Sequence, residues 1–312
     1  MPKRPTTEDA LAAIHAIRQA PEQHDLAREL AAFLEHKSNH VVAAAAATAE
    51  GFEIGALAPN LVEAFGRLMR GPAKLDSGCK ATIAIVQALV ALEDPAARVF
   101  FAGIRHVQKE GSFGPPVDAA APLRGLCARG LARMGHPDAL LECVTLLADP
   151  EIPARTGAVR AIADSGRLDG VLLLRLKALL GDKEVEVTGE CFSGLLALDP
   201  ASVEFVAQFL NGRDEEVAEQ AALALGDSHL AAAFPYLREA WERGGSSELR
   251  QALLTAIGLL RNDDSLEFLL GLLGEESAIT AKAALGALRL YTSDDTVRKR
   301  VDAILEQRGD LV

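Results

Sequence analysis

The 312-residue sequence predicts an all-α protein built as an array of helix pairs, an α-solenoid. Three observations predict this fold. Ala and Leu dominate the apolar residues, whereas aromatic residues make up only 4% of the chain, and Ala and Leu are the residues that a helix accommodates at the lowest cost. Turn signals recur at a nearly regular interval, and the alternation of apolar and polar residues that marks a half-buried strand is absent.

The turn signals mark a repeat of roughly 28 to 36 residues, the length of two short helices and two turns. One such helix pair cannot bury its apolar stripes alone, but stacking on neighbouring pairs does so, which is why these units occur in arrays. The signals lie at His136-Pro137-Asp138, Arg167-Leu168-Asp169, Asp199-Pro200, Asp227-Ser228, Asn262-Asp263 and Ser293-Asp294.

The clearest helix pair spans residues 200–227. We expect its first helix to end at Asn211-Gly212, which tolerates the left-handed conformation of a C-cap. We expect its second helix to begin after Asp214, whose side chain can cap it, with further acids at the positive end of the helix dipole. Each helix carries one apolar stripe: Val203, Val206, Ala207 and Leu210 in the first, and Val217, Ala221, Ala224 and Leu225 in the second.

The second helices share a capping acid and an Ala-rich tail that ends in Gly, as in 149–166, 214–226 and 248–258, and the first and last of these ranges also carry an apolar-then-basic pair. In this pattern the chain resembles the HEAT-repeat family of armadillo-like helical proteins and its bacterial relatives of the PBS-lyase type. The resemblance is strong from about His136 to Tyr291 and weaker before. It implies a right-handed α-solenoid, an α-α superhelix whose concave face, formed by the second helices, binds a protein or peptide.

The segments before residue 134 also fit helix pairs, although longer and irregular ones, at 21–52, 59–92 and 94–134. We count about eight HEAT-like pairs, with capping helices at Thr7–Ala20 and Asp295–Arg308. We therefore expect a single solenoid over 1–312, with irregular repeats in 1–134 and with regular repeats and the C-terminal cap in 135–312.

The net charge and the cysteine spacing limit which classes of partner and which cellular compartment we expect. The net charge of −12 disfavours binding to nucleic acid or to an anionic membrane. The four cysteines are widely spaced and include no Cys-x-x-Cys pair, which is typical of buried thiols in a reducing cytosol rather than of a metal site or a disulfide framework. Residues 1–20 lack the pattern of a signal peptide, and the apolar runs are too short to span a membrane. We expect a cytoplasmic protein without metal or cofactor.

A loop at residues 109–118 interrupts the third helix pair, with two Gly and two Pro within six residues. Long loops in regular arrays are where binding tends to be concentrated. The candidate binding residues in and around this loop are Lys80, Arg105, His106, Phe113, Asp118 and Arg124, together with Arg155 in the next pair.

Each of these candidates has a structural alternative. Asp118 and Arg124 are six residues apart, as are Asp149 and Arg155. In HEAT-like repeats such an acid and base form a ladder that ties one inner helix to the next. His106 can equally be a helix-face histidine, and Phe113 can pin the loop to the array.

The following second helices are acidic, and their candidate binding residues are Glu186, Glu190, Glu216 and Glu219. The alternative for these residues is a merely solvated helix face. An inner surface that is basic around Lys80, Arg124 and Arg155 and then becomes acidic would suit a protein partner with a charge dipole.

The sequence thus favours a protein-binding scaffold or adaptor with no catalytic residue. Walker, His-Glu-x-x-His and Gly-x-Ser-x-Gly motifs are absent, and a nucleophile at Cys127 beside His106 would rest on spacing alone. The alternative is a small-ligand or enzymatic pocket near 109–118, of the bilin-lyase type or another. A closed cavity lined by Arg105, His106 and Asp118 would favour that pocket, and an open groove would favour the scaffold.

The repeat register generates a stability prediction. It places Leu195, Leu225 and Ile257 between successive helix pairs, so truncating one of them leaves a cavity. We expect Leu225→Ala to lower the free energy of unfolding by about 2–5 kcal/mol, measured by denaturant titration. An unchanged unfolding midpoint would show that the register is wrong.

Overall fold

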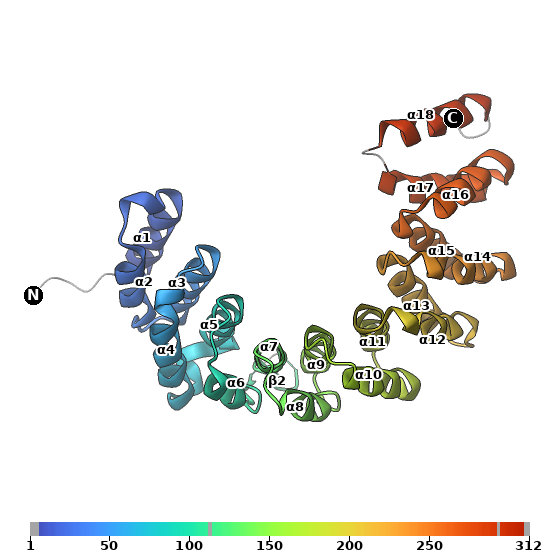
Figure 1. Ribbon diagram of the computed structural model, residues 1–312. Helices are drawn as coiled ribbons and strands as arrows, with labels where there is room; N and C mark the ends of the chain where they lie inside the picture. The colour runs from blue at the N-terminus through green and yellow to red at the C-terminus, as the bar shows by residue number, and fades with distance from the viewer. Residues whose placement is uncertain (1–5, 112–113, 292–293, 309–312) are drawn as a thin grey trace, which may run out of the picture. The chain divides into compact units, whose positions relative to one another are not determined.

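The computed structural model of the chain describes residues 6–111, 114–291 and 294–308. These residues form 18 α-helices and one pair of two-residue strands (Figure 1). The chain divides into two compact units, unit 1 at Met1–Gly166 and unit 2 at Arg167–Val312. No helix in the described ranges combines the length and the apolar character needed to cross a membrane.

Unit 1 consists of one leading helix and four helix pairs. The second helices of the pairs, α3, α5, α7 and α9, pack side by side in one layer, and the first helices form the other layer (Figure 1). The helices are α1 (Thr7–Gln19), α2 (Leu26–Leu34), α3 (Asn39–Gly51), α4 (Ala58–Arg70), α5 (Lys80–Ala91), α6 (Ala97–Gly103), α7 (Ala121–Arg133), α8 (Ala139–Leu146) and α9 (Ile152–Asp164).

Unit 2 repeats this plan with four pairs and a closing helix. Its second helices are α11, α13, α15 and α17, each packed on the next. The helices are α10 (Asp169–Leu180), α11 (Val185–Leu198), α12 (Val203–Ala207), α13 (Glu215–Asp227), α14 (Phe234–Arg243), α15 (Ser247–Leu260), α16 (Asp263–Glu275), α17 (Ala278–Leu288) and α18 (Asp295–Gln307).

Within each unit the described residues therefore confirm the predicted all-α fold of stacked, HEAT-like helix pairs, four in unit 1 and four in unit 2, with α1 and α18 as the predicted capping helices. The predicted pair at 200–227 is α12, extended by a 3-10 turn over Gln208–Asn211, and α13. Asp214 caps α13 as expected, because its carboxylate accepts the Val217 N–H at 3.3 Å. Leu195, Leu225 and Ile257 are fully buried, which confirms the predicted register.

Helices α7 and α9 pack backbone to backbone in unit 1. The approach depends on Gly125 and Gly157: a Cβ atom added to Gly125 would lie 2.8 Å from the Cα of Gly157 and 3.0 Å from the Pro153 carbonyl oxygen. Real Cβ atoms do not come this close to backbone atoms, so any side chain at Gly125 has to push the two helices apart.

Alanine substitution of two helical glycines should have opposite effects. Gly125→Ala should lower the free energy of unfolding by about 1–3 kcal/mol because the added methyl group overpacks the α7–α9 contact. Gly271→Ala in α16, where an added Cβ meets nothing within 4 Å, should raise it by up to about 1 kcal/mol because Ala is the better helix former. Denaturant unfolding measures both. Equal effects of the two substitutions would contradict the close approach.

Candidate functional site

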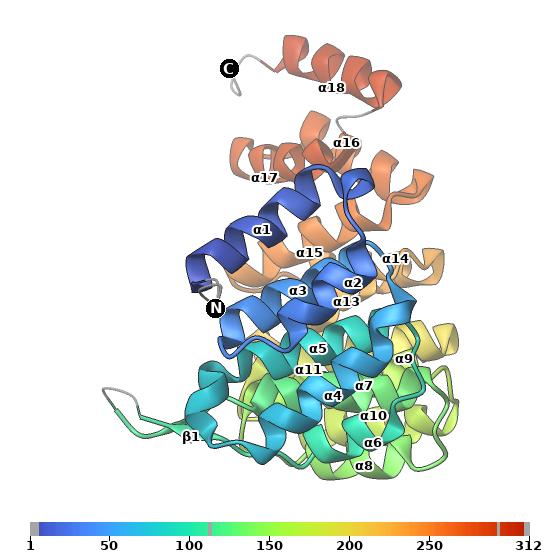
Figure 2. The ribbon, with the colours of Figure 1, turned by 90° about the vertical axis from the view of Figure 1, so that its left-hand side faces the viewer.

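The predicted loop at 109–118 is a β-hairpin at its base. Strand β1 (Lys109–Glu110) pairs antiparallel with β2 (Val117–Asp118), Lys109 opposite Asp118 and Glu110 opposite Val117. Figure 2 shows the hairpin projecting away from the helices of unit 1. The sequence predicted an irregular loop here. The structure differs because the two ends of the segment lie close enough to form backbone hydrogen bonds between two short strands. Phe113 lies outside the described residues, so its role stays a prediction.

Glu110 fastens the hairpin to the turn before α5. Its carboxylate accepts hydrogen bonds from the Gly78 N–H at 2.7 Å, the Ser77 hydroxyl at 3.1 Å and the Gln108 amide at 2.7 Å. The Gly78 N–H and then the Gln108 amide hold the pKa of Glu110 below its usual range. The carboxylate is therefore charged at neutral pH, and the base of the hairpin has a fixed position.

Asp76 orders the same turn. Its buried carboxylate accepts the N–H groups of Ala81 and Thr82, at 2.8 and 2.9 Å, and so caps α5. The Asn39 amide of α3 donates to it as well, at 3.3 Å. Asp76 is thus a structural residue, and the neighbouring Lys80, the first residue of α5, is exposed.

Arg124 on α7 is buried and joins three segments of unit 1. Its guanidinium makes two hydrogen bonds to the carboxylate of Asp149, both 2.9 Å, and one to Asp118 at 2.8 Å. It also donates to the His106 carbonyl at 2.9 Å. Burial opposes its charge, but the two carboxylates outweigh burial and raise the pKa of Arg124 above its ordinary value.

Asp118 is equally enclosed. Burial alone would raise its pKa, but hydrogen bonds from the Gln108 N–H, Arg124 and the Ala120 N–H hold it below the usual range. On α9, Arg155 is buried and donates to the carbonyls of Asp149 and Pro150 at 2.9 and 3.0 Å. These contacts support the ladder interpretation of Asp118, Arg124 and Arg155, because none of the three side chains reaches the surface.

Arg105 and His106 remain beside the hairpin. Arg105 is exposed, forms an ion pair with Glu142 of α8 and lies 5.8 Å from the centre of the Phe101 ring. The half-buried ring of His106 contacts the Gln108 side chain at 3.4 Å. The Asp118 carboxylate faces Arg124 and backbone donors. Arg105, His106 and Asp118 therefore do not line a common cavity.

The buried thiols carry no sign of nucleophilic chemistry. Burial raises the pKa of Cys127 far above its ordinary value and that of Cys143 to about 12. A reactive cysteine needs a lowered pKa and solvent access. The Cys127 alternative therefore has no support from the geometry. No group of three or more metal-ligating side chains is arranged around a cation site in the residues that the structure covers.

An open groove of about 570 Å³ lies on the second helices of unit 2. Its walls come from α11 and α13, and its apolar part from Leu223, Ala224 and Leu259. The predicted site residues Glu186 and Glu190 both line it. Its remaining lining residues are Gly189, Ser193, Gln220 and Asp227. This is the open, acidic surface that the sequence favoured for a scaffold.

Glu219 lies one turn back along α13, where its neighbours are other carboxylates. Partial burial and then the negative charges of Glu248, Glu216 and Glu215 raise the pKa of Glu219. Glu215 and Glu216 are exposed in the first turn of α13, and Glu248 is exposed in the first turn of α15. The structure thus brings the predicted residues Glu216 and Glu219 into one acidic cluster that extends to α15.

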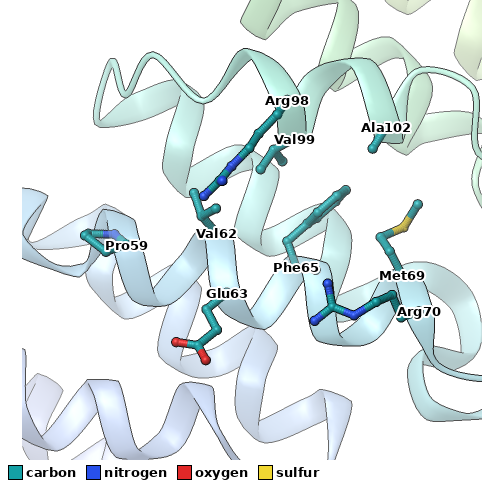
Figure 3. A pocket seen from close by; sticks show the side chains of 10 residues that line it. Pro59, Val62, Glu63, Phe65, Met69, Arg70, Arg98, Val99 and Ala102 are labelled. Atoms are coloured by element: carbon teal, nitrogen blue, oxygen red, sulfur yellow. The ribbon is translucent and has the colours of Figure 1, made fainter.

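A second pocket, of about 590 Å³, lies between α4 and α6 in unit 1 (Figure 3). Phe65, Met69 and Val99 give it an apolar wall, and Arg70 and Arg98 lie at its edges. Like the groove on unit 2 it is open, so its shape alone does not favour a small ligand. No sequence signal pointed to it, because the same apolar spacing in α4 is needed to pack any first helix.

The Arg124 contacts generate a stability prediction. Arg124→Met removes the only described cation that bonds both Asp118 and Asp149, and leaving the buried Asp118 and the half-buried Asp149 without this counter-charge should cost about 3–5 kcal/mol of unfolding free energy. Arg105→Met, which breaks an exposed ion pair, is the matched control and should cost less than about 1 kcal/mol. Urea unfolding of both variants gives the comparison.

The pH dependence has a defined sign. Since the pKa of Asp118 is lowered in the folded protein, its contribution to stability is present at neutral pH and is lost as pH falls through that lowered pKa. The stability gap between wild type and Arg124→Met should therefore narrow in acid. A gap that stays constant down to about pH 3 would contradict this assignment, because the unfolded carboxyl has a pKa near 4.

Comparison with known proteins adds a likeness of fold. No protein-family model and no curated protein matches the sequence. The chain is similar to the complex of CpcE and CpcF of phycocyanin lyase from Nostoc sp. PCC7120, at 17% identity and a TM-score of 0.37, over 80% of this chain and 93% of that chain. It is also similar to human deoxyhypusine hydroxylase in complex with glycerol, at 18% identity and a TM-score of 0.27, over 80% of this chain and 96% of that chain. Both are HEAT-repeat proteins, and at these low scores the likeness carries no argument about function.

Proposed function

We propose that the protein is a binding scaffold whose second helices in unit 2 hold a basic segment of a protein or peptide partner. The observation that carries this proposal is the acidic groove of α11 and α13 with the carboxylate cluster beside it. Glu186, Glu190, Glu216 and Glu219 are the proposed contact residues. They belong to the helices that the HEAT resemblance assigns to the concave face.

The electrostatics of Glu219 support a cationic partner. The charges that raise its pKa are all negative, so in the free protein the carboxylates repel one another at neutral pH. A lysine or arginine of a partner would replace this repulsion by attraction and would also speed association. The groove adds an apolar part at Leu223 and Leu259, which suits the aliphatic stem of such a side chain or an apolar neighbour.

The helix dipole accounts for some of these acids but not for all. Glu186, Glu215, Glu216 and Glu248 lie in first helical turns, where a negative charge stabilises its own helix through the dipole. This effect falls off beyond the first turn. Glu190 and Glu219 lie one turn further, so the helix dipole gives no reason for an acid at either position.

The region around the hairpin is the proposed second contact region. Lys80 and Arg105 are exposed there and His106 is half-buried, and the projecting hairpin would act as a specificity element. The alternative, a small-ligand or enzymatic pocket beside 109–118, has less support because Asp118 bonds to Arg124 and to backbone N–H groups. The single-solenoid organisation and the cytoplasmic location stay predictions.

The test compares capture of host proteins by wild type and by a neutralised variant. Mass spectrometry of the captured proteins identifies the partner of the wild type. The partner should be missing from the proteins captured by a variant that combines Glu186→Gln, Glu190→Gln and Glu219→Gln. In a titration with the purified partner, the affinity of this variant should be at least about tenfold lower than that of the wild type. Affinity of the wild type should fall as salt rises, because exposed charges are screened. Circular dichroism should show that the variant keeps the helical content of wild type, so that a loss of capture reports on binding rather than on folding.

The matched control neutralises three exposed acids on first helices of the same unit, Glu204→Gln, Glu239→Gln and Glu242→Gln. The change in net charge is identical, so a general charge effect would weaken both variants alike. We expect the control to capture the partner as wild type does. Equal capture by all three proteins would remove the acidic groove from the binding site.

A further inference from the structure

The outward side of helix α10 in unit 2 is a row of exposed leucines. We call it the α10 crest and define it as Leu168, Leu172, Leu176, Leu179 and Leu180, whose exposed fractions range from 56% to 76%. The residues on the opposite side of the helix, Gly170, Leu174 and Ala178, are buried against the unit. Figure 1 shows α10 in the layer of first helices, with α12, α14 and α16. The crest is therefore not needed for the core.

Two other first helices of unit 2 expose charged residues. Helix α14 exposes Arg238, Glu239, Glu242 and Arg243, and α16 begins with Asp263 and Asp264. On α10 the leucines leave roughly 300–600 Å² of apolar surface, at about 60–120 Å² for each leucine side chain. This is the size of the largest apolar patch on a typical monomeric protein, and such a patch is often functional.

We propose that the α10 crest is a homodimer interface, in which α10 of one copy packs antiparallel against α10 of a second copy. In a two-fold symmetric pair the same surface meets itself. A row of leucines on a helix is complementary to its own copy, because side chains three and four residues apart interdigitate with those of the facing helix. Leu172 and Leu176 would lie near the two-fold axis.

Charge around the crest favours a second copy of this acidic chain. Two cations beside it form ion pairs within the unit, Arg167 with Asp169 at 2.6 Å and Lys177 with Asp182 at 2.7 Å, and Arg175 lies over the Phe205 ring at 4.8 Å. Pairing of two crests therefore brings apolar surface together without placing uncompensated like charges face to face.

Charge and dipole also favour the antiparallel orientation. Asp169 lies in the first turn of α10 and the exposed Lys183 lies just past its end. Antiparallel packing brings Asp169 of each copy towards Lys183 of the other, whereas parallel packing would bring like charges together. Opposed helix dipoles add to this preference.

The size of the crest predicts a weak dimer. Two copies would bury roughly 600–1,200 Å² in total, which is below the size of stable interfaces and in the range of weak, transient ones. We therefore expect a reversible, concentration-dependent dimer of the full chain in the micromolar range rather than an obligate one. Sedimentation equilibrium between about 1 and 200 μM would detect it at such an affinity.

The first experiment places a charge at the centre of the crest. Leu172→Glu should raise the dimer dissociation constant at least about tenfold, because two carboxylates would be buried near the axis. Ile279→Glu on α17, where the side chain is 85% exposed, is the matched control and should dimerise as wild type does. A wild-type chain that stays monomeric at 200 μM, or a Leu172→Glu chain that dimerises normally, would overturn the proposal and leave the crest to a partner of another sequence.

The second experiment tests the orientation through disulfide geometry. The four native cysteines are buried, so new thiols at Leu168→Cys and Leu180→Cys report on contacts between copies. Disulfides form where Cα atoms are about 4.4–6.8 Å apart. A mixture of the two variants should give a mixed disulfide dimer under mild oxidation, whereas neither alone should. A homodimeric disulfide of Leu168→Cys alone would overturn the antiparallel arrangement.

Discussion

The organisation of unit 1 depends on one buried cation, the guanidinium of Arg124. It has partners on both sides along the chain, Asp118 at the end of the hairpin and Asp149 in the turn before α9, and it also binds the His106 carbonyl. A buried guanidinium is tolerated only when its donors are satisfied and its charge is matched. Both conditions fix the positions of three segments at once, so the hairpin base, α7 and the start of α9 form one rigid group.

The same group explains why the chain can carry a projecting hairpin without loosening the array. Glu110 ties β1 to the turn before α5, and Asp118 at the end of β2 is held by Arg124. At α7 and α9 the glycine pair lets the backbones touch, so the Arg124 ion pairs need to span only a short distance. Polar contacts thus stabilise the base of the hairpin, and close packing of glycines stabilises the adjacent α7–α9 contact.

Much of the fold could be predicted because helix pairs repeat a local pattern. Caps such as Asp214 and buried positions such as Leu225 are set by spacing along one or two helices. The ladder alternative for Asp118 and Arg124 could be stated for the same reason. The hydrogen bonds of Glu110 could not, because their donors at Ser77 and Gly78 are more than thirty residues away. Gly226, predicted as a stop, instead lies inside α13 and packs closely on Ala256 of α15. Spacing also cannot tell which side of α10 is buried, because leucines occupy both sides: Leu174 is buried, whereas Leu176 on the opposite side is exposed.

The contrast between Leu174 and Leu176 follows from how helix pairs pack in an array. Each pair contacts its neighbours along the array, so the outward sides of the first helices and the exposed sides of the second helices are both free of folding constraints. Sequence on those two sides therefore reflects what the protein meets rather than how it folds. In unit 2 one side carries carboxylates that repel one another around Glu219, and the other carries leucines at the α10 crest. Neither arrangement stabilises the isolated unit, because one stores repulsion and the other exposes apolar surface to water. The repulsion favours a cationic partner on the layer of second helices, and the exposed leucines favour an apolar partner on the layer of first helices. Unit 2 is therefore expected to make two different interactions.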